Sequence, residues 1–319
     1  MGLRPKGHAL GYLFLRALRA FEALLPVACL RVLFWPPAAI KATWELAWTE
    51  PTLRLFRRLP ASIRIPASRR NWLWRLWLAR TRLNVTKFML FWPDRLGTLR
   101  WRQRLRFSSV EQLDYLRNCN RPVILAVLHI GPLLLLRYYL RSRGLPVAGL
   151  VARPLSERSP IRQYLDRLSD EAYGMIGIPN VFDLAQLRSL HEFLQPNRML
   201  IVALDGGHGN HVFVPNGDSS FRMASGAIRL AAHRSALVVP CLIRADRLLG
   251  AWVHFGEPVP DALIADPRNH LAGCTHLFRE FLPFLRAHPE EGSYEFLCRF
   301  RLESPARKLA TSAPATPGS

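Results

Sequence analysis

The sequence predicts an α/β protein with a mostly parallel or mixed central sheet covered by helices, preceded by basic, amphipathic, membrane-associated helices. After Pro122, short runs rich in β-branched residues alternate with amphipathic stretches. Buried strands separated by helices are typical of a sheet that is covered on both faces. The positive charge lies mainly before this point, because residues 1–128 hold 23 Lys and Arg against six Asp and Glu, or +17 of the formal net charge of +21.

The first part of the chain has apolar residues at helical spacing and many tryptophans between its arginines. The spacing predicts three helices, at about 8–34, 40–58 and 71–92. Prolines separate them, at Pro36-Pro37, Pro60 and Pro93. The tryptophans are Trp35, Trp44, Trp48, Trp72, Trp74, Trp77, Trp92 and Trp101. Aromatic residues mixed with cations are typical of an anionic membrane surface, where apolar side chains enter lipid and cations meet phosphates. Single-stranded nucleic acid is the competing partner, and without an RNA-binding motif no nucleic acid is expected.

These helices are expected to lie on the membrane rather than to cross it. Between residues 8 and 40, every window of about twenty residues is interrupted by a charge or a proline. The interrupting residues are Arg16, Arg19, Glu22, Pro26 and Arg31. A signal peptide needs a short apolar core followed by a small-residue cleavage site, a pattern that the sequence does not show. The five cysteines form no Cys-x-x-Cys motif, which predicts free thiols in a reducing compartment.

The second part of the chain alternates between predicted strands and predicted helices. The strands are expected at 122–128, 146–152, 198–204, 236–243 and 251–255. The helices are expected at 132–143, 158–171, 183–194, 222–233 and 268–287. The chain is thus divided into a basic, Trp-rich helical region at 1–110, an α/β domain at 111–303 and a disordered tail at 304–319.

His129 and Asp205 each follow a predicted strand directly. Because the carboxyl ends of parallel strands meet at one edge of a sheet, the two side chains are expected to share a crevice. His129 is followed by Gly131, which leaves room for a substrate, and by Pro132, which suits the first position of a helix. The pattern favours a catalytic base, while a hydrogen-bonded core histidine is the more common interpretation of such a residue considered alone.

Four segments carry a family pattern in order: His129-Ile130-Gly131-Pro132-Leu133-Leu134, "VARPLSERSPIRQYLDRL", "ALDGGHGNHVFVP" and "SGAIRLAAHRSALVVPCLIR". Over about residues 70–290 they resemble the lysophospholipid acyltransferase superfamily, most closely the lauroyl/myristoyl acyltransferases of lipid A assembly. Arg153, Pro154 and Pro160 match in the second segment. The resemblance implies an enzyme of lipid biosynthesis at the cytoplasmic face of a bacterial inner membrane.

The resemblance also implies the reaction. His129 would act as a general base that takes a proton from an acceptor hydroxyl, so that the oxygen attacks an acyl thioester. The implied donor is acyl-ACP or acyl-CoA, and the acceptor is a glycolipid, a lysophospholipid or a lipidated metabolite. No cofactor is implied.

The sequence departs from the family at the acid that should hold the histidine, because Leu134 stands in its place. Residues 133–136 are all leucine, and the next carboxylate is Glu157. Loss of the partner costs about 10⁴-fold in the serine protease triad. Three possibilities stay open: Asp205 or Glu157 supplies the carboxylate, a backbone carbonyl or water orients His129, or the protein is a catalytically degenerate acyl- or lipid-binding relative that acts as a partner or scaffold.

Further residues are candidates for substrate binding. Gly206 and Gly207 can expose N–H groups to a phosphate or an oxyanion, although a plain tight turn explains them equally well. Arg153 and Arg222 are placed to meet a phosphate or a developing oxyanion. Gly226 belongs to the fourth family segment, and Leu133 to Leu136 would line an apolar channel for the acyl chain. His208 and His211 with Asp205 imitate metal ligands, but no helix aligns them, so no metal is expected.

Overall fold

The fold is seen in a computed structural model, which describes residues 7–48, 60, 63, 69–151, 159–207, 209–246, 248–292 and 294–302. Its main sheet has seven strands in the order β1-β9-β8-β2-β5-β3-β4. The strands are β1 Leu105–Phe107, β2 Val123–Val127, β3 Val147–Val151, β4 Val181–Asp183, β5 Met199–Ala203, β8 Leu237–Ala245 and β9 Ala251–Phe255. All neighbours are parallel except β8 and β9, which are antiparallel. The expected mostly parallel, mixed α/β sheet is confirmed.

The central strand shows why the sheet is buried on both faces. Every residue of β2 is buried, and successive side chains point to opposite faces of the sheet. Ile124 and Ala126 join one hydrophobic cluster, whereas Val123, Leu125 and Val127 join the other. Helices cover both clusters, so the apolar run of β2 never meets water.

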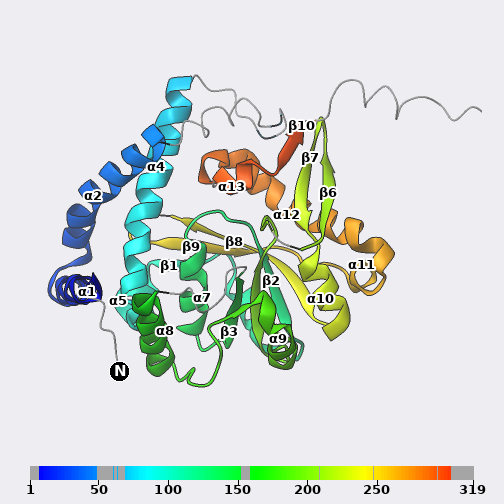
Figure 1. The fold of residues 1–319 in the computed structure, drawn as a ribbon, viewed down its shortest axis with the longest axis horizontal. Coiled ribbons are helices and arrows are strands. Elements are labelled where there is room, and N and C mark those ends of the chain that lie inside the picture. Colours follow the sequence, from blue (N-terminus) through cyan, green and yellow to red (C-terminus); the bar gives the residue numbers. More distant parts are fainter. Residues whose placement is uncertain are drawn as a thin grey trace, which may run out of the picture.

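The helices divide between these two faces (Figure 1). The face of Ile124 is covered mainly by α9 Leu187–Phe193, α10 Gly226–Arg234, α11 Asp261–Ala265, α12 His270–Ala287 and α13 Tyr294–Leu297. The cluster on the face of Val123 includes side chains of α6 Val110–Asn118, of α7 Leu133–Arg141 and of the helices that precede the sheet. The remaining helices of the body are α5 Leu99–Arg102 and α8 Pro160–Ala172.

Three helices before the sheet lie together along one side of the body (Figure 1). They are α1 Gly7–Leu24, α2 Val27–Trp48 and α4 Arg69–Lys87. None of the helices in the described part of the chain combines the length and the hydropathy needed to span a bilayer.

The predicted boundaries of these helices were wrong in two places. The single helix expected at 8–34 is interrupted at Leu25-Pro26, where α1 ends and α2 begins. Pro36 and Pro37, expected to break the chain, lie inside α2. A proline removes one helical hydrogen bond, and here packing of α2 against α4 accompanies the continued helix. The part of the second predicted helix beyond Trp48 lies outside the described residues.

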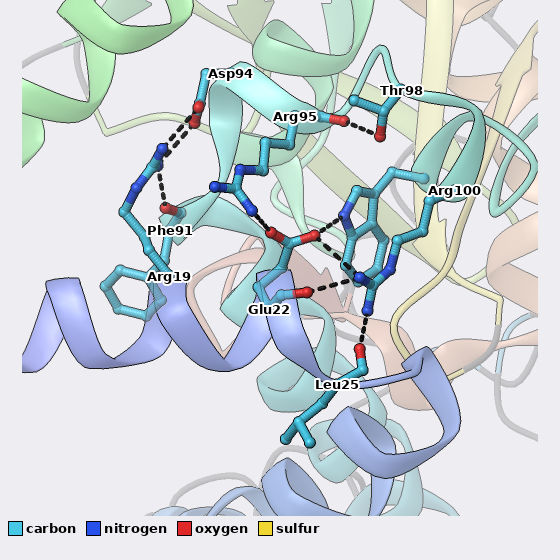
Figure 2. A network of polar contacts seen from close by, with 9 residues as sticks. Arg19, Glu22, Leu25, Phe91, Asp94, Arg95, Thr98 and Arg100 are labelled. Atoms are coloured by element: carbon cyan, nitrogen blue, oxygen red, sulfur yellow. Dashed lines mark hydrogen bonds and ion pairs between the residues drawn. The ribbon is translucent and has the colours of Figure 1, made fainter.

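A network of polar contacts joins α1 to the body (Figure 2). The Arg19 guanidinium donates to both carboxylate oxygens of Asp94, at 2.8 and 2.7 Å. The Glu22 carboxylate is 2% exposed. It accepts from Trp101 Nε1 at 2.8 Å and pairs with Arg95 and Arg100. Arg19 and Glu22 of α1 therefore face the body, whereas Arg16 is exposed.

A second, smaller sheet was not predicted. Its strands are β6 His211–Asn216, β7 Ser219–Ala224 and β10 Phe300–Leu302, in the order β10-β7-β6. The helix expected at 222–233 begins only at Gly226, because residues 219–224 pair with β6 in a hairpin. The helix expected at 183–194 likewise begins at Leu187, after β4 and a turn of 3-10 helix. The predicted tail at 304–319 lies outside the described residues.

Candidate active site

His129 and Asp205 lie at the carboxyl ends of neighbouring parallel strands. His129 follows β2 and Asp205 follows β5, and the last residues of these strands, Val127 and Ala203, are paired in the sheet. Both side chains therefore leave the sheet at the same edge, as the order of strands and motifs predicted.

The two side chains are in direct contact. His129 Nδ1 lies 2.9 Å from Asp205 Oδ1, and the His129 backbone N–H donates to both carboxylate oxygens at 3.1 Å. The Asp205 side chain is fully buried, whereas 38% of the His129 side chain is exposed. A carboxylate that accepts from Nδ1–H fixes the ring orientation and leaves Nε2 as the nitrogen that can take a proton. Asp205 thus has the geometry of the acid that the sequence lacks at position 134.

The four leucines after His129 do not share one environment. Leu134 is 54% exposed, while Leu135 and Leu136 are buried in the core beneath the sheet. Leu133 is partly buried against the same cluster. The expected channel of four leucines is therefore wrong, since only Leu133 and Leu134 are accessible from the surface.

Gly131 has a different role from the one expected. Its φ is +64°, and a Cβ at this position would lie 2.0 Å from the carbonyl oxygen of Ile243 in β8. The glycine therefore lets the His129 loop press against the backbone of β8, where any side chain would collide. The space beside its α-carbon is filled by protein rather than left open to a substrate.

A turn near the C-terminus holds the other side of the His129 loop. Ile130 forms an antiparallel bridge with Gly292, and Arg80 of α4 donates to the Gly292 carbonyl oxygen at 2.8 Å. The preceding Glu290 pairs with Arg75 of α4 at 3.0 Å. Through these contacts, α4 holds the turn that pairs with Ile130, the residue next to the candidate base. No short sequence motif signals these contacts.

Glu291 in this turn is buried, and burial raises the pKa of its carboxyl group to about 7. The charge of Glu290 raises it further, while Arg82, His288 and Arg244 act in the opposite direction. The site is therefore bordered by an acid that titrates near neutral pH.

The loop after Asp205 leads to the small sheet. The Gly206 carbonyl oxygen lies 2.9 Å from His211 Nε2, and Arg222 Nη2 lies 3.2 Å from His211 Nδ1. Arg299 Nε donates to the Asp205 carbonyl oxygen at 2.9 Å. Arg222 thus lies on β7 instead of the predicted helix, and Arg299 is a residue of this region that the sequence motifs missed.

The remaining candidates are less closely connected. Gly207 is exposed in the same loop, and a Cβ there would lie 3.5 Å from Arg299 Nη2. Gly226 is exposed at the start of α10, where a Cβ would meet no atom within 4 Å. Arg153, Glu157 and His208 lie outside the described residues. Within the part of the chain that the structure describes, no group of three or more His, Cys, Asp or Glu could hold a metal ion.

Comparison with known proteins adds no family to this geometry. No protein-family model matches the chain, and no curated protein matches it. Function is therefore inferred from the residues of the site and from the surfaces around it.

Proposed function

We propose that the protein is a membrane-associated acyltransferase that moves a fatty acyl group from a thioester donor to a hydroxyl group of a lipid. The observation that carries the proposal is the 2.9 Å contact between His129 Nδ1 and the buried Asp205 carboxylate. The resemblance of the His129 and Asp205 segments to lysophospholipid acyltransferases supports this reaction over other uses of a His–Asp pair.

The proposed reaction uses His129 twice. Nε2 takes the proton of the acceptor hydroxyl as its oxygen attacks the thioester carbonyl carbon. When the resulting tetrahedral intermediate collapses, the carbon–sulfur bond breaks and the imidazolium returns the proton to the leaving thiolate. Asp205 stabilises the imidazolium and keeps its ring in place. The N–H groups of Gly206 and Gly207, directly after Asp205, are the proposed donors to the oxyanion.

The membrane part of the proposal rests on apolar side chains that face outward. More than half of the exposed large apolar residues in the described chain lie on α1, α2 and α4. They are Leu13, Phe14, Phe21, Leu24, Val32, Leu33, Trp35, Ile40, Trp44, Trp48 and Trp74. Many exposed apolar side chains on helices that also carry arginines fit the interface of an anionic bilayer.

The tryptophans of α2 and α4 cluster within this surface. The ring centroids of Trp44 and Trp48 are 5.2 Å apart, and those of Trp74 and Trp77 are 5.1 Å apart. Trp74 and Trp77 also line a hollow of about 530 Å³ between the two helices, with Leu46 and Arg70 in its wall. Arg80, on the same helix as the wall of this hollow, contacts the turn that pairs with Ile130 beside His129.

A catalytically silent acyl- or lipid-binding relative is the alternative. The feature that favoured it was Leu134 in place of the motif acid. Since Asp205 lies at hydrogen-bond distance from His129, Leu134 alone no longer argues for a silent protein.

The two functions are separated by acyl transfer with labelled donors. Purified protein is incubated with acyl-ACP or acyl-CoA and with vesicles that contain lysophospholipid or glycolipid acceptors. The wild type is expected to label the acceptor, and His129→Ala is expected to lose about 10²–10⁴-fold of the rate. Equal rates in both proteins, or no transfer with any donor and acceptor, would reject the enzyme. Acyl-lipid binding without transfer would support the silent relative.

A further inference from the structure

The small sheet has one apolar face and one basic face. Val214, Phe221 and Phe300 are opposite one another in the strand register and lie in the hydrophobic cluster that covers the main sheet. Side chains alternate along a strand, so the residues between them point the other way. This second face carries His211, Phe213, Ser220, Arg222, Arg299 and Arg301.

Two arginines of the basic face are placed side by side. The Arg222 backbone N–H donates to the Arg299 carbonyl oxygen at 3.0 Å, which extends the pairing of β7 and β10 by one residue. Residues that are directly opposite in an antiparallel pair have Cβ atoms about 4.5–5.5 Å apart. Both guanidinium groups can therefore reach one small anion.

The charge of these arginines is not balanced nearby. Among the described residues, no Asp or Glu side chain forms an ion pair with Arg222, Arg299 or Arg301. The two fully buried arginines of α7 do have such partners, Arg137 in Asp166 and Arg141 in Asp170. The hairpin itself has one acid, Asp218, at its turn. The basic face thus carries positive charge that an anion would neutralise.

Existing contacts orient both arginines beside the candidate base. His211 Nε2 donates to the Gly206 carbonyl oxygen, so His211 Nδ1 is the acceptor for Arg222 Nη2. Arg299 uses Nε to hold the Asp205 carbonyl oxygen, and the Asp205 carboxylate holds His129. One residue, Asp205, therefore connects the basic face to the imidazole.

We propose that Arg222 and Arg299 bind a phosphate group of the substrate that reacts at His129. This inference rests on the proposed acyl transfer, and it assigns to that site a substrate with a phosphate ester. Two guanidinium forks suit the several oxygens of a phosphate, and Arg301, stacked 4.6 Å from the Phe213 ring, adds positive charge beside them. The phosphate can belong to the phosphopantetheine arm of the donor or to the headgroup of a lipid acceptor.

Equilibrium binding of two matched pairs of probes tests the proposal and distinguishes the two sources. The donor pair is 4′-phosphopantetheine and pantetheine; the acceptor pair is a short-chain lysophosphatidic acid and the monoacylglycerol of the same chain. The wild type is expected to prefer the phosphorylated member of one pair by about 10-fold or more. The pair that shows the preference identifies the source of the phosphate.

Substitutions assign the preference to the two arginines. Arg222→Gln and Arg299→Gln are each expected to weaken binding of the phosphorylated probe by about 10-fold and to leave the other probe unchanged. Arg299→Lys keeps the charge without the forked guanidinium, and its affinity for the phosphorylated probe should lie between those of Arg299→Gln and the wild type. Arg188→Gln is the matched control, because Arg188 is exposed on α9 and pairs with Glu192.

A measurement on the wild type covers the case in which a variant misfolds. Arginines are modified with phenylglyoxal and located by mass spectrometry, with and without each probe. Selective protection of Arg222 and Arg299 by the phosphorylated probe supports the site. Equal affinities within both pairs, a preference retained in both Gln variants, or no protection would each overturn it. Because binding is measured without turnover, a protein that prefers phosphate but transfers no acyl group would lose the transferase proposal and keep this site.

Discussion

The N-terminal helices and the α/β body differ in how their exposed apolar side chains are distributed. In the body, β2 is apolar and wholly buried between two covered faces. In α1, Glu22 is buried against Arg95, Arg100 and Trp101 (Figure 2). Leu13 and Leu24 of the same helix are exposed. α1 thus buries one carboxylate and leaves several large apolar side chains exposed, while its Arg16 is exposed and its Leu15 and Leu18 are buried.

The proposed membrane association would explain this difference. Exposed apolar side chains cost free energy in water, and the proposed membrane surface would offset that cost by covering them with lipid. In the body, the exposed large apolar residues are distributed over several helices, a turn and β6. We therefore expect substitutions in the body to change chemistry and stability, and outward substitutions in the N-terminal helices to change membrane binding.

The largest effect is expected at Asp205. Asp205→Asn should lower acyl transfer by up to about 10⁴-fold, because the amide no longer holds the imidazole in the required tautomer. Vesicle binding should not change. Asp183→Asn is the matched control, since Asp183 also lies at the end of a parallel strand but caps a turn at Ala185.

Leu134 provides the complementary test. Adding Leu134→Glu to Asp205→Asn restores a carboxylate to the family position, but Leu134 is exposed on α7 and its replacement should not restore transfer. Recovery of activity in that double variant would show that the acid acts from α7 and that Asp205 is dispensable.

The next effect is the pH dependence of stability caused by Glu291, which lies in the turn where α4 contacts the body. Burial raises the pKa of Glu291 from 4.5 to about 7, so the folded protein keeps this proton to higher pH than the unfolded chain. The contribution to stability is complete below pH 4.5 and is lost as the pH rises through 7. The free energy of unfolding of Glu291→Gln, relative to that of the wild type, should therefore rise by up to about 3 kcal/mol from pH 5 to pH 8, as measured by urea unfolding. An unchanged difference at the two pH values would contradict the shift.

Glu22 tests the inward charges of α1. Glu22→Ala leaves Arg95, Arg100 and Trp101 without their shared acceptor and is expected to destabilise the docking of α1 by about 2–3 kcal/mol. Hydrogen exchange should quicken in α1 and stay slow in β2. Glu192→Ala, at an exposed ion pair on α9, should change stability by less than about 1 kcal/mol. Equal effects of the two variants would remove the contrast between the regions.

The smallest effect on stability, with a clear effect on binding, is expected for the outward tryptophans. Trp44→Ala and Trp48→Ala should each change the free energy of unfolding by about 0.5 kcal/mol or less. Both should weaken binding to anionic vesicles in sedimentation, and salt should release only part of the wild type because it screens charges and not apolar insertion. Leu271→Ala, an exposed apolar residue on α12, is the control that should leave vesicle binding unchanged.

The sequence was most informative where an apolar run was long or where the order of the strands brought two residues together. The apolar run of β2 predicted a buried strand, and the ends of β2 and β5 predicted that His129 and Asp205 would meet. Prolines were less informative, because Pro36 and Pro37 lie within α2 while Pro26 accompanies a break. The N-terminal boundaries therefore depended on packing between helices, which no local signal reports.

The small sheet was missed although the sequence contains its signal. Gly217-Asp218 between two apolar-rich runs is typical of a two-residue hairpin loop, and Gly217 has the positive φ that such a turn requires. The role of Arg299 could not be predicted in the same way. It reaches Asp205 only because β10 pairs with β7 across a long stretch of chain.

The most direct test of the central claim is a double-mutant cycle on acyl transfer with wild type, His129→Ala, Asp205→Asn and the double variant. If Asp205 acts through His129, the double variant should be no slower than His129→Ala, so the two losses should be strongly non-additive. Losses that multiply in the double variant would show that the two residues act independently and would contradict the His129–Asp205 pair as one catalytic unit.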